Sequence, residues 1–122
     1  MSRGSIHKIA VTLKEWEYLS NVAARHLQTT ESKRQREVYT KLREKFTHLG
    51  EEVSRGVYVL SLSRVEVKEL LNRARAELAT LTDNVIPAYE ASNRPLREQY
   101  VIRSRQHIEF LNSLTQKMEA RL

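Results

Sequence analysis

The feature that most constrains this chain is a strand-like segment that ends in a helix-capping pair, and this feature occurs twice. In "IHKIAVTL", apolar and other residues alternate as in a half-buried strand, and Thr12 is followed three residues later by Glu15. In "VYVLSLS", β-branched and aromatic residues predominate, and Ser63 is followed by Glu66 at the same spacing. A hydroxyl and a carboxylate three residues apart can cap each other's backbone N–H groups at the start of a helix. The sequence therefore predicts two strands, each followed at once by a helix.

Four stretches carry apolar residues at spacings of three and four, the pattern of an amphipathic helix. The expected apolar stripes are Trp16, Leu19, Ala23 and Leu27; Val38, Leu42, Phe46 and Leu49; Val67, Leu70, Leu71, Ala74, Leu78 and Leu81; and Tyr100, His107, Ile108, Leu111, Leu114, Met118 and Leu122, in a helix from about Pro95. On the first strand, Ile9, Val11 and Leu13 are expected on the buried face. The predicted fold is mainly α with a minor two-stranded sheet (α+β), with four amphipathic helices.

The order strand, helix, helix is expected in two arms of a single domain spanning residues 1–122. Arm A covers about residues 6–50 and arm B about residues 57–122. The match between "LREKF" and "LTQKM" in the second helix of each arm favours an internal repeat, although two common local patterns could also converge. We expect the strands to pair antiparallel across a pseudo-twofold axis. Because two strands alone are marginal in water, a homodimer through a strand edge or the last helix is a further hypothesis.

Arm B contains a surplus segment, residues 80–95, which holds both prolines and has no clear period. It is interpreted as a long loop or a broken helix, and as a site of partner binding. Tyr89, Arg94 and Arg97 are the candidate binding residues, because aromatic and arginine side chains often dominate interfaces. The alternative is that the segment extends the preceding helical stripe into the core.

Composition excludes several kinds of chemistry. The chain has no cysteine, so it has neither disulfides nor thiolate chemistry. Its four histidines occur in no recognisable triad or metal-ligand spacing, and its glycines form no phosphate-binding loop. No enzyme activity, cofactor or metal is therefore expected. No apolar run is long enough for a membrane span or a signal peptide, so the expected location is the cytoplasm, without membrane contact.

A net charge of +6 favours an acidic partner. On the second helix Arg34, Lys41 and Lys45 follow one edge of the apolar stripe and could contact the phosphates of DNA or RNA. Glu37 and Glu44 lie between the basic edges and would repel phosphate, and the basic side chains could equally cover the flanks of a buried stripe. This interleaving favours a non-catalytic protein-binding inhibitor or adaptor that covers an acidic protein surface; nucleic-acid binding is the alternative.

The first strand and helix, from Ile9 to Leu27, resemble the opening of a ribbon-helix-helix DNA-binding protein. The resemblance implies that Lys8, Ala10 and Thr12 face the major groove from a strand that pairs with a second strand. "ESKRQREV" departs from the apolar start of that family's second helix. As a small, basic, cysteine-free helical protein, the chain is also similar in style to accessory proteins of bacteriophages and plasmids.

Overall fold

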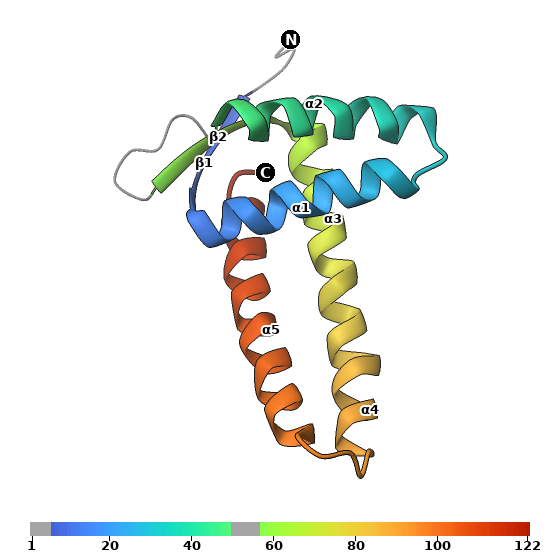
Figure 1. The fold of residues 1–122 in the computed structure, drawn as a ribbon. Helices are drawn as coiled ribbons and strands as arrows, with labels where there is room; N and C mark the ends of the chain where they lie inside the picture. Colours follow the sequence, from blue (N-terminus) through green and yellow to red (C-terminus); the bar gives the residue numbers. More distant parts are fainter. Residues whose placement is uncertain (1–5, 50–56) are drawn as a thin grey trace. The chain divides into compact units, whose positions relative to one another are not determined.

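The computed structural model describes residues 6–49 and 57–122 and confirms a mainly helical fold with a small antiparallel sheet (Figure 1). The elements are β1 (Ile6–Thr12), α1 (Leu13–Thr29), α2 (Lys33–Leu49), β2 (Val57–Ser63), α3 (Arg64–Thr80), the π-helical turn η1 (Leu81–Val85), α4 (Ile86–Glu90) and α5 (Arg97–Glu119). The chain forms two compact units, Met1–Leu70 with Arg121–Leu122, and Leu71–Ala120. The single domain inferred from the sequence stays a prediction.

The two strands of the first unit pair antiparallel within one chain, and Ile9 lies opposite Leu60 at the centre of the pairing. Ile9 and Leu60 are 51 positions apart in sequence, and so are the cap residues Thr12 and Ser63. Equivalent positions of the two strands therefore meet at the middle of the sheet. As in any antiparallel pair, the backbone of the sheet has a local pseudo-twofold axis, which here lies between Ile9 and Leu60. The antiparallel pairing is confirmed, and the duplication of the two arms stays a prediction.

Both capping boxes are present, and they explain why each strand becomes a helix without a linker. Thr12 N–H donates to Glu15 Oε1 at 2.9 Å and Glu15 N–H donates to Thr12 Oγ1 at 3.2 Å. Ser63 and Glu66 make the same reciprocal pair, at 2.8 and 3.2 Å. Each pair satisfies backbone donors that the first helical turn leaves without a partner. Leu13 was expected on the buried strand face, which is wrong: it is the first residue of α1, where the period of two has ended, and it is exposed.

The core of the first unit is built from one face of the sheet and the apolar stripes of α1 and α2, which lie side by side (Figure 1). Its buried side chains include Ile9, Val11, Tyr58, Leu60 and Leu62 from the strands, Leu19 and Ala23 from α1, and Tyr39, Leu42 and Phe46 from α2. Trp16 is only half-buried and stacks on Tyr58, with ring centroids 5.3 Å apart. Tyr39 was not in the expected stripe; its ring is fully buried, and its hydroxyl donates to Glu69 Oε2 at 3.2 Å.

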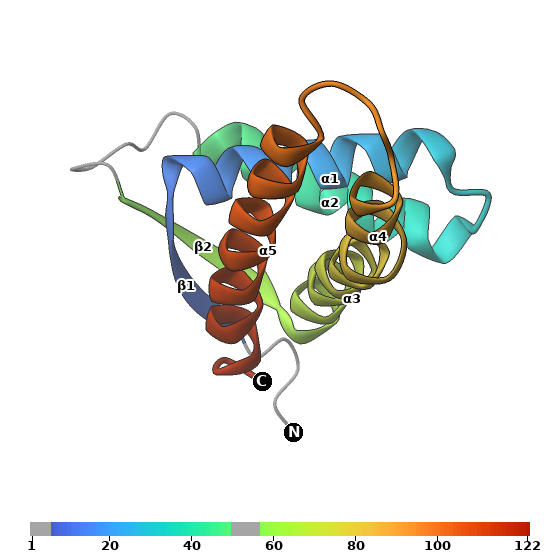
Figure 2. The same ribbon diagram turned by 90° about the horizontal axis from the view of Figure 1, so that it is seen from below.

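The second unit is a helical hairpin in which the rod that continues from α3 through η1 and α4 runs antiparallel to α5 (Figures 1 and 2). The expected irregular segment of residues 80–95 is much shorter, because the helix continues to Glu90. Ile86 N–H donates to the Leu81 carbonyl, five residues back, and this wider turn directly precedes Pro87, which has no N–H to donate. A π-helical turn thus accommodates the proline without ending the helix.

The buried side chains of the second unit include Leu71, Ala74, Ile86, Leu111, Leu114 and Met118. They confirm the centres of the expected stripes, whereas the ends of the last stripe are wrong, since Tyr100 and Leu122 are exposed. Helix α5 begins at Arg97, two residues after the expected start near Pro95. Leu96 precedes it with φ of 69°, a left-handed conformation that a residue with a Cβ rarely adopts.

Candidate functional site

The outer face of the two-stranded sheet is the most distinctive exposed surface of the first unit. Side chains alternate across a strand, so the burial of Ile9 and Leu60 turns their neighbours outward. We define the ribbon face as the four central outward residues, Lys8, Ala10, Val59 and Ser61, all of which are exposed. Lys8 lies opposite Ser61, and Ala10 lies opposite Val59. These two pairs flank the centre of the sheet on either side.

The ribbon face lacks acidic groups. Neither strand contains an aspartate or a glutamate. The acids at the two strand ends, Glu15 and Glu66, are each only 4% exposed and are held in the capping boxes. Arg64 and Lys68, in the first turns of α3, are exposed, whereas Glu17 is an exposed acid in the corresponding part of α1. The balance of exposed charge on and beside the sheet is therefore positive.

Thr12 has a different role from the one that the ribbon-helix-helix resemblance implies. Its hydroxyl oxygen accepts the N–H of Glu15, and the hydroxyl of Ser63 accepts the N–H of Glu66. These outer positions serve the helix starts. The central residues of the ribbon face are therefore the ones best placed to contact a partner.

The three basic residues expected to line one edge of α2 differ in their contacts. Arg34 and Lys41 are exposed, as are the acids Glu37 and Glu44 on the same helix. Lys45 forms an ion pair with the buried carboxylate of Glu66, so this lysine has a structural partner within the unit. The described part of α2 thus presents mixed charge, in contrast to the ribbon face.

The residues expected in the surplus segment lie near the tip of the helical hairpin in the second unit. Tyr89 is half-buried and stacks on Tyr100, with centroids 5.0 Å apart and an interplanar angle of 8°. The Arg97 guanidinium donates to the carbonyl oxygens of Glu90 and Ser92 at 3.4 and 3.2 Å. Arg94 is exposed between α4 and α5. Tyr89 and Arg97 therefore hold the tip together, and Arg94 is the most available of the three.

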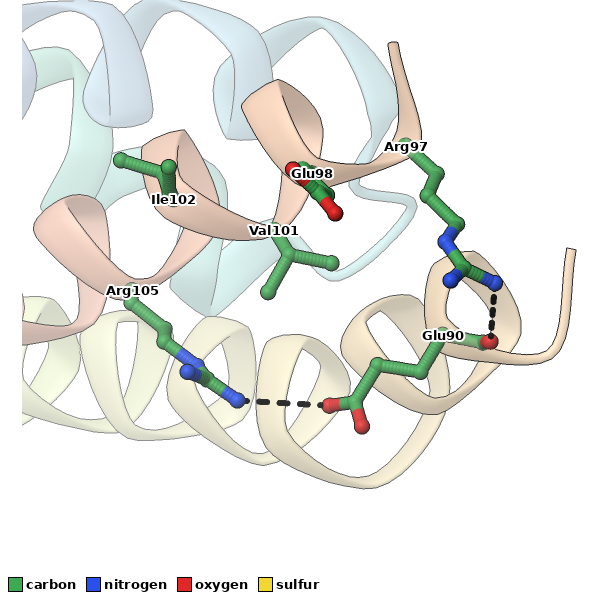
Figure 3. A pocket seen from close by; sticks show the side chains of 6 residues that line it. All are labelled: Glu90, Arg97, Glu98, Val101, Ile102 and Arg105. Carbon is green, nitrogen blue, oxygen red and sulfur yellow. Dashed lines mark hydrogen bonds and ion pairs between the residues drawn. The ribbon is translucent and has the colours of Figure 1, made fainter. Parts of the chain in front are cut away.

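A shallow pocket of about 380 Å³ lies beside this tip (Figure 3). It is lined by Glu90, Arg97, Glu98, Val101, Ile102 and Arg105. The Arg105 guanidinium and the Glu90 carboxylate are 3.5 Å apart, and both side chains are mostly exposed, so their ion pair contributes little to stability. The lining contains no nucleophile beside a base, and the Arg97 guanidinium in it is bound to backbone carbonyl oxygens.

Within residues 6–49 and 57–122, no three histidine, aspartate or glutamate side chains come together as a metal site. Among the same residues, no helix is both long and apolar enough to cross a membrane. Sequence reasoning named Lys8 and Ala10 but missed Val59 and Ser61. The signal that could have identified them is the alternation along the second strand, where Val59 and Ser61 lie between the apolar residues Tyr58, Leu60 and Leu62. The chain matches no protein-family model, no curated protein and no solved structure.

Proposed function

We propose that this protein is a non-catalytic macromolecule-binding protein whose ribbon face binds double-stranded DNA. The observation that carries the proposal is an exposed, acid-free, two-stranded ribbon with Lys8 and Ser61 at its centre. The major groove of B-DNA is about 12 Å wide and admits a two-stranded ribbon of this kind. The opposite face of the ribbon is packed in the core of the first unit, which holds the two strands in place while the exposed face contacts a groove.

The charge of the molecule supports the same partner. A net charge of +6 attracts polyanions, and the exposed Arg64 and Lys68 lie where a strand passes into a helix, next to the ribbon. The sequence favoured a protein partner because α2 mixes acids with bases. A surface that binds phosphates should be free of acids, and the ribbon face meets this requirement whereas α2 does not. Double-stranded RNA is less suitable, because its major groove is too narrow for side chains to read.

The test is the binding of the full chain to fluorescent duplex DNA over a series of salt concentrations. We expect the logarithm of the affinity to fall linearly with the logarithm of the salt concentration. Lys8→Gln combined with Ser61→Ala should weaken binding about tenfold, since both side chains would contact base edges or phosphate. Lys41→Gln on the exposed surface of α2 is the matched control, because it also removes one positive charge, and it should weaken binding less. Failure of the parent protein to bind any duplex at low salt would refute the proposal.

A second candidate, a protein-binding inhibitor or adaptor of the phage or mobile-element type, is favoured by the tip of the helical hairpin. Leu96 and Ile102 are 58% and 55% exposed, and Tyr100 is also exposed. Exposed apolar side chains beside arginines are typical of surfaces that bind an acidic protein. The variant Arg94→Ala with Leu96→Ser leaves the Tyr89 stack intact. It should abolish capture of a protein that the parent retains from nuclease-treated lysate, and unchanged capture would exclude the tip.

A homodimer and a cytoplasmic location belong to the same proposal. Each strand of the sheet has one edge without a partner strand among the described residues, and such edges can pair with a second copy. Light scattering over a range of protein concentrations measures this association. A monomer at every concentration would exclude the homodimer and leave DNA binding untouched.

A further inference from the structure

The ribbon is symmetric in its backbone and asymmetric in its side chains. The pseudo-twofold axis between Ile9 and Leu60 relates Lys8 to Val59 and Ala10 to Ser61. Neither related pair matches in chemistry, because a lysine corresponds to a valine and an alanine to a serine. The same axis relates Thr12 to Ser63, which do match and make identical caps. The asymmetry is thus located at the exposed centre of the sheet and not at the helix starts.

Cross-strand pairing sorts these four residues into two unlike halves. Lys8 faces Ser61 across the strands and forms a polar half, and Ala10 faces Val59 and forms an apolar half. Directly opposed side chains in an antiparallel pair have Cβ atoms about 5 Å apart, so each pair acts as one patch. Val59 is 49% exposed even though it is apolar, so the apolar half is open to a partner.

In a DNA groove the two halves would prefer different bases. Lysine donates to guanine O6 and N7, and a serine hydroxyl can add a hydrogen bond to a neighbouring base edge. Alanine and valine offer no hydrogen bond and instead contact the thymine methyl group. Alternate residues on a strand lie roughly 6.7 Å apart, which is about two base-pair steps of 3.4 Å. The halves would therefore contact neighbouring but distinct steps of one short site.

We infer that this protein recognises a non-palindromic duplex, with guanine next to the Lys8 and Ser61 half and thymine next to the Ala10 and Val59 half. The inference rests on the proposed function, and it adds the nature of the site. A ribbon made by two identical chains carries the same residues on both sides of its axis, and its sites mirror that symmetry. In this ribbon the axis relates unlike residues, so the two halves of the target must also differ.

The test selects binding sites from a randomised duplex library with the full chain. The parent should enrich a short motif that is not an inverted repeat and has guanine on one side and thymine on the other. The double variant Val59→Lys with Ala10→Ser gives both halves the polar pair and should enrich an inverted repeat of the guanine element. Both substituted positions are exposed, so the melting temperature should stay close to that of the parent.

The reciprocal variant, Lys8→Val with Ser61→Ala, is the matched control, because it makes both halves apolar. It should lose the guanine preference and bind more weakly. If either double variant does not fold, the single change Lys8→Gln still tests the inference. It should abolish the preference for guanine at one step of the site and keep the preference for thymine at the other.

An inverted repeat selected by the parent, or a parent motif that none of the variants alters, overturns the inference. Binding without any sequence preference also overturns it while the proposed function stands. No binding to any duplex overturns both.

Discussion

At the scale of single residues, Glu66 has two roles at the junction of β2 and α3. Its Oε1 accepts the backbone N–H of Ser63 and also a hydrogen bond from the ammonium of Lys45, and its side chain is only 6% exposed. A buried carboxylate is costly without a partner, and both contacts lower this cost. Lys45 therefore contributes to the stability of the first unit, although the sequence pointed to it as a partner-binding residue.

Lys45→Gln should lower the free energy of unfolding by about 1–3 kcal/mol, because it leaves the Glu66 carboxylate without its cation. Lys41→Gln, one helical turn earlier and exposed, should change it by less than about 0.5 kcal/mol. Urea denaturation measures both. Equal effects of the two changes would mean that the ion pair contributes nothing to stability.

The aromatic residues Phe46 and Trp16 differ in burial, although the sequence placed both in apolar stripes. Phe46 is 1% exposed, and Phe46→Ala should cost about 3–5 kcal/mol. Trp16 is half-buried and retains solvent contact beside Tyr58, so Trp16→Ala should cost less. Thermal or urea unfolding of the two variants gives the order. A larger loss for Trp16 would place the centre of the core nearer to the Trp16 stack.

At the scale of elements, local chemistry predicted the two strands, their caps and the starts of the helices that follow them. Thr12 and Ser63 fix where each helix begins with residues three positions away, so the sequence alone was sufficient. The helical course of Leu81–Glu90 could not be predicted in the same way. Pro87 and the Asp83–Asn84 pair argue against a helix locally, and only a π-helical turn together with the burial of Ile86 makes the helix continue.

The start of α5 offers a test at this scale, because Leu96 has a left-handed backbone. A Cβ in this conformation costs roughly 1–2 kcal/mol, partly offset in glycine by its larger unfolded-state entropy. Leu96→Gly should therefore be more stable than Leu96→Ala by about 1 kcal/mol. Both variants lose the same exposed side chain, so their melting temperatures isolate the backbone effect. An alanine variant as stable as the glycine variant would show that this turn relaxes easily.

At the scale of the whole molecule, the surface that we propose as the binding site arises only when two distant segments pair. Lys8 and Ala10 could be identified from the first strand by its alternation, but Val59 and Ser61 lie about fifty residues later in a strand with a less regular pattern. Their significance depends on the register and on which face is buried. Tyr89 and Arg97 were named from the sequence as partner-binding residues, but both make contacts within the hairpin. Residue type alone could not predict these contacts.

Because the sheet pairs within one chain, folding should not require a second copy. We expect the melting temperature to be the same over about a hundredfold range of protein concentration, since only a folding reaction coupled to association depends on concentration. Scanning calorimetry or circular dichroism measures it. A melting temperature that rises with concentration would mean that the sheet depends on a dimer.

The position of Ile9 opposite Leu60 also affects how such a surface can change in evolution. In a homodimer every mutation is copied onto both sides of the axis, so a new contact must suit both halves of the target at once. In this chain a codon change at Val59 leaves Lys8, its counterpart across the axis, as it was. Each side can therefore acquire a new preference while the other retains the existing partner, and selection can act on the two sides one at a time.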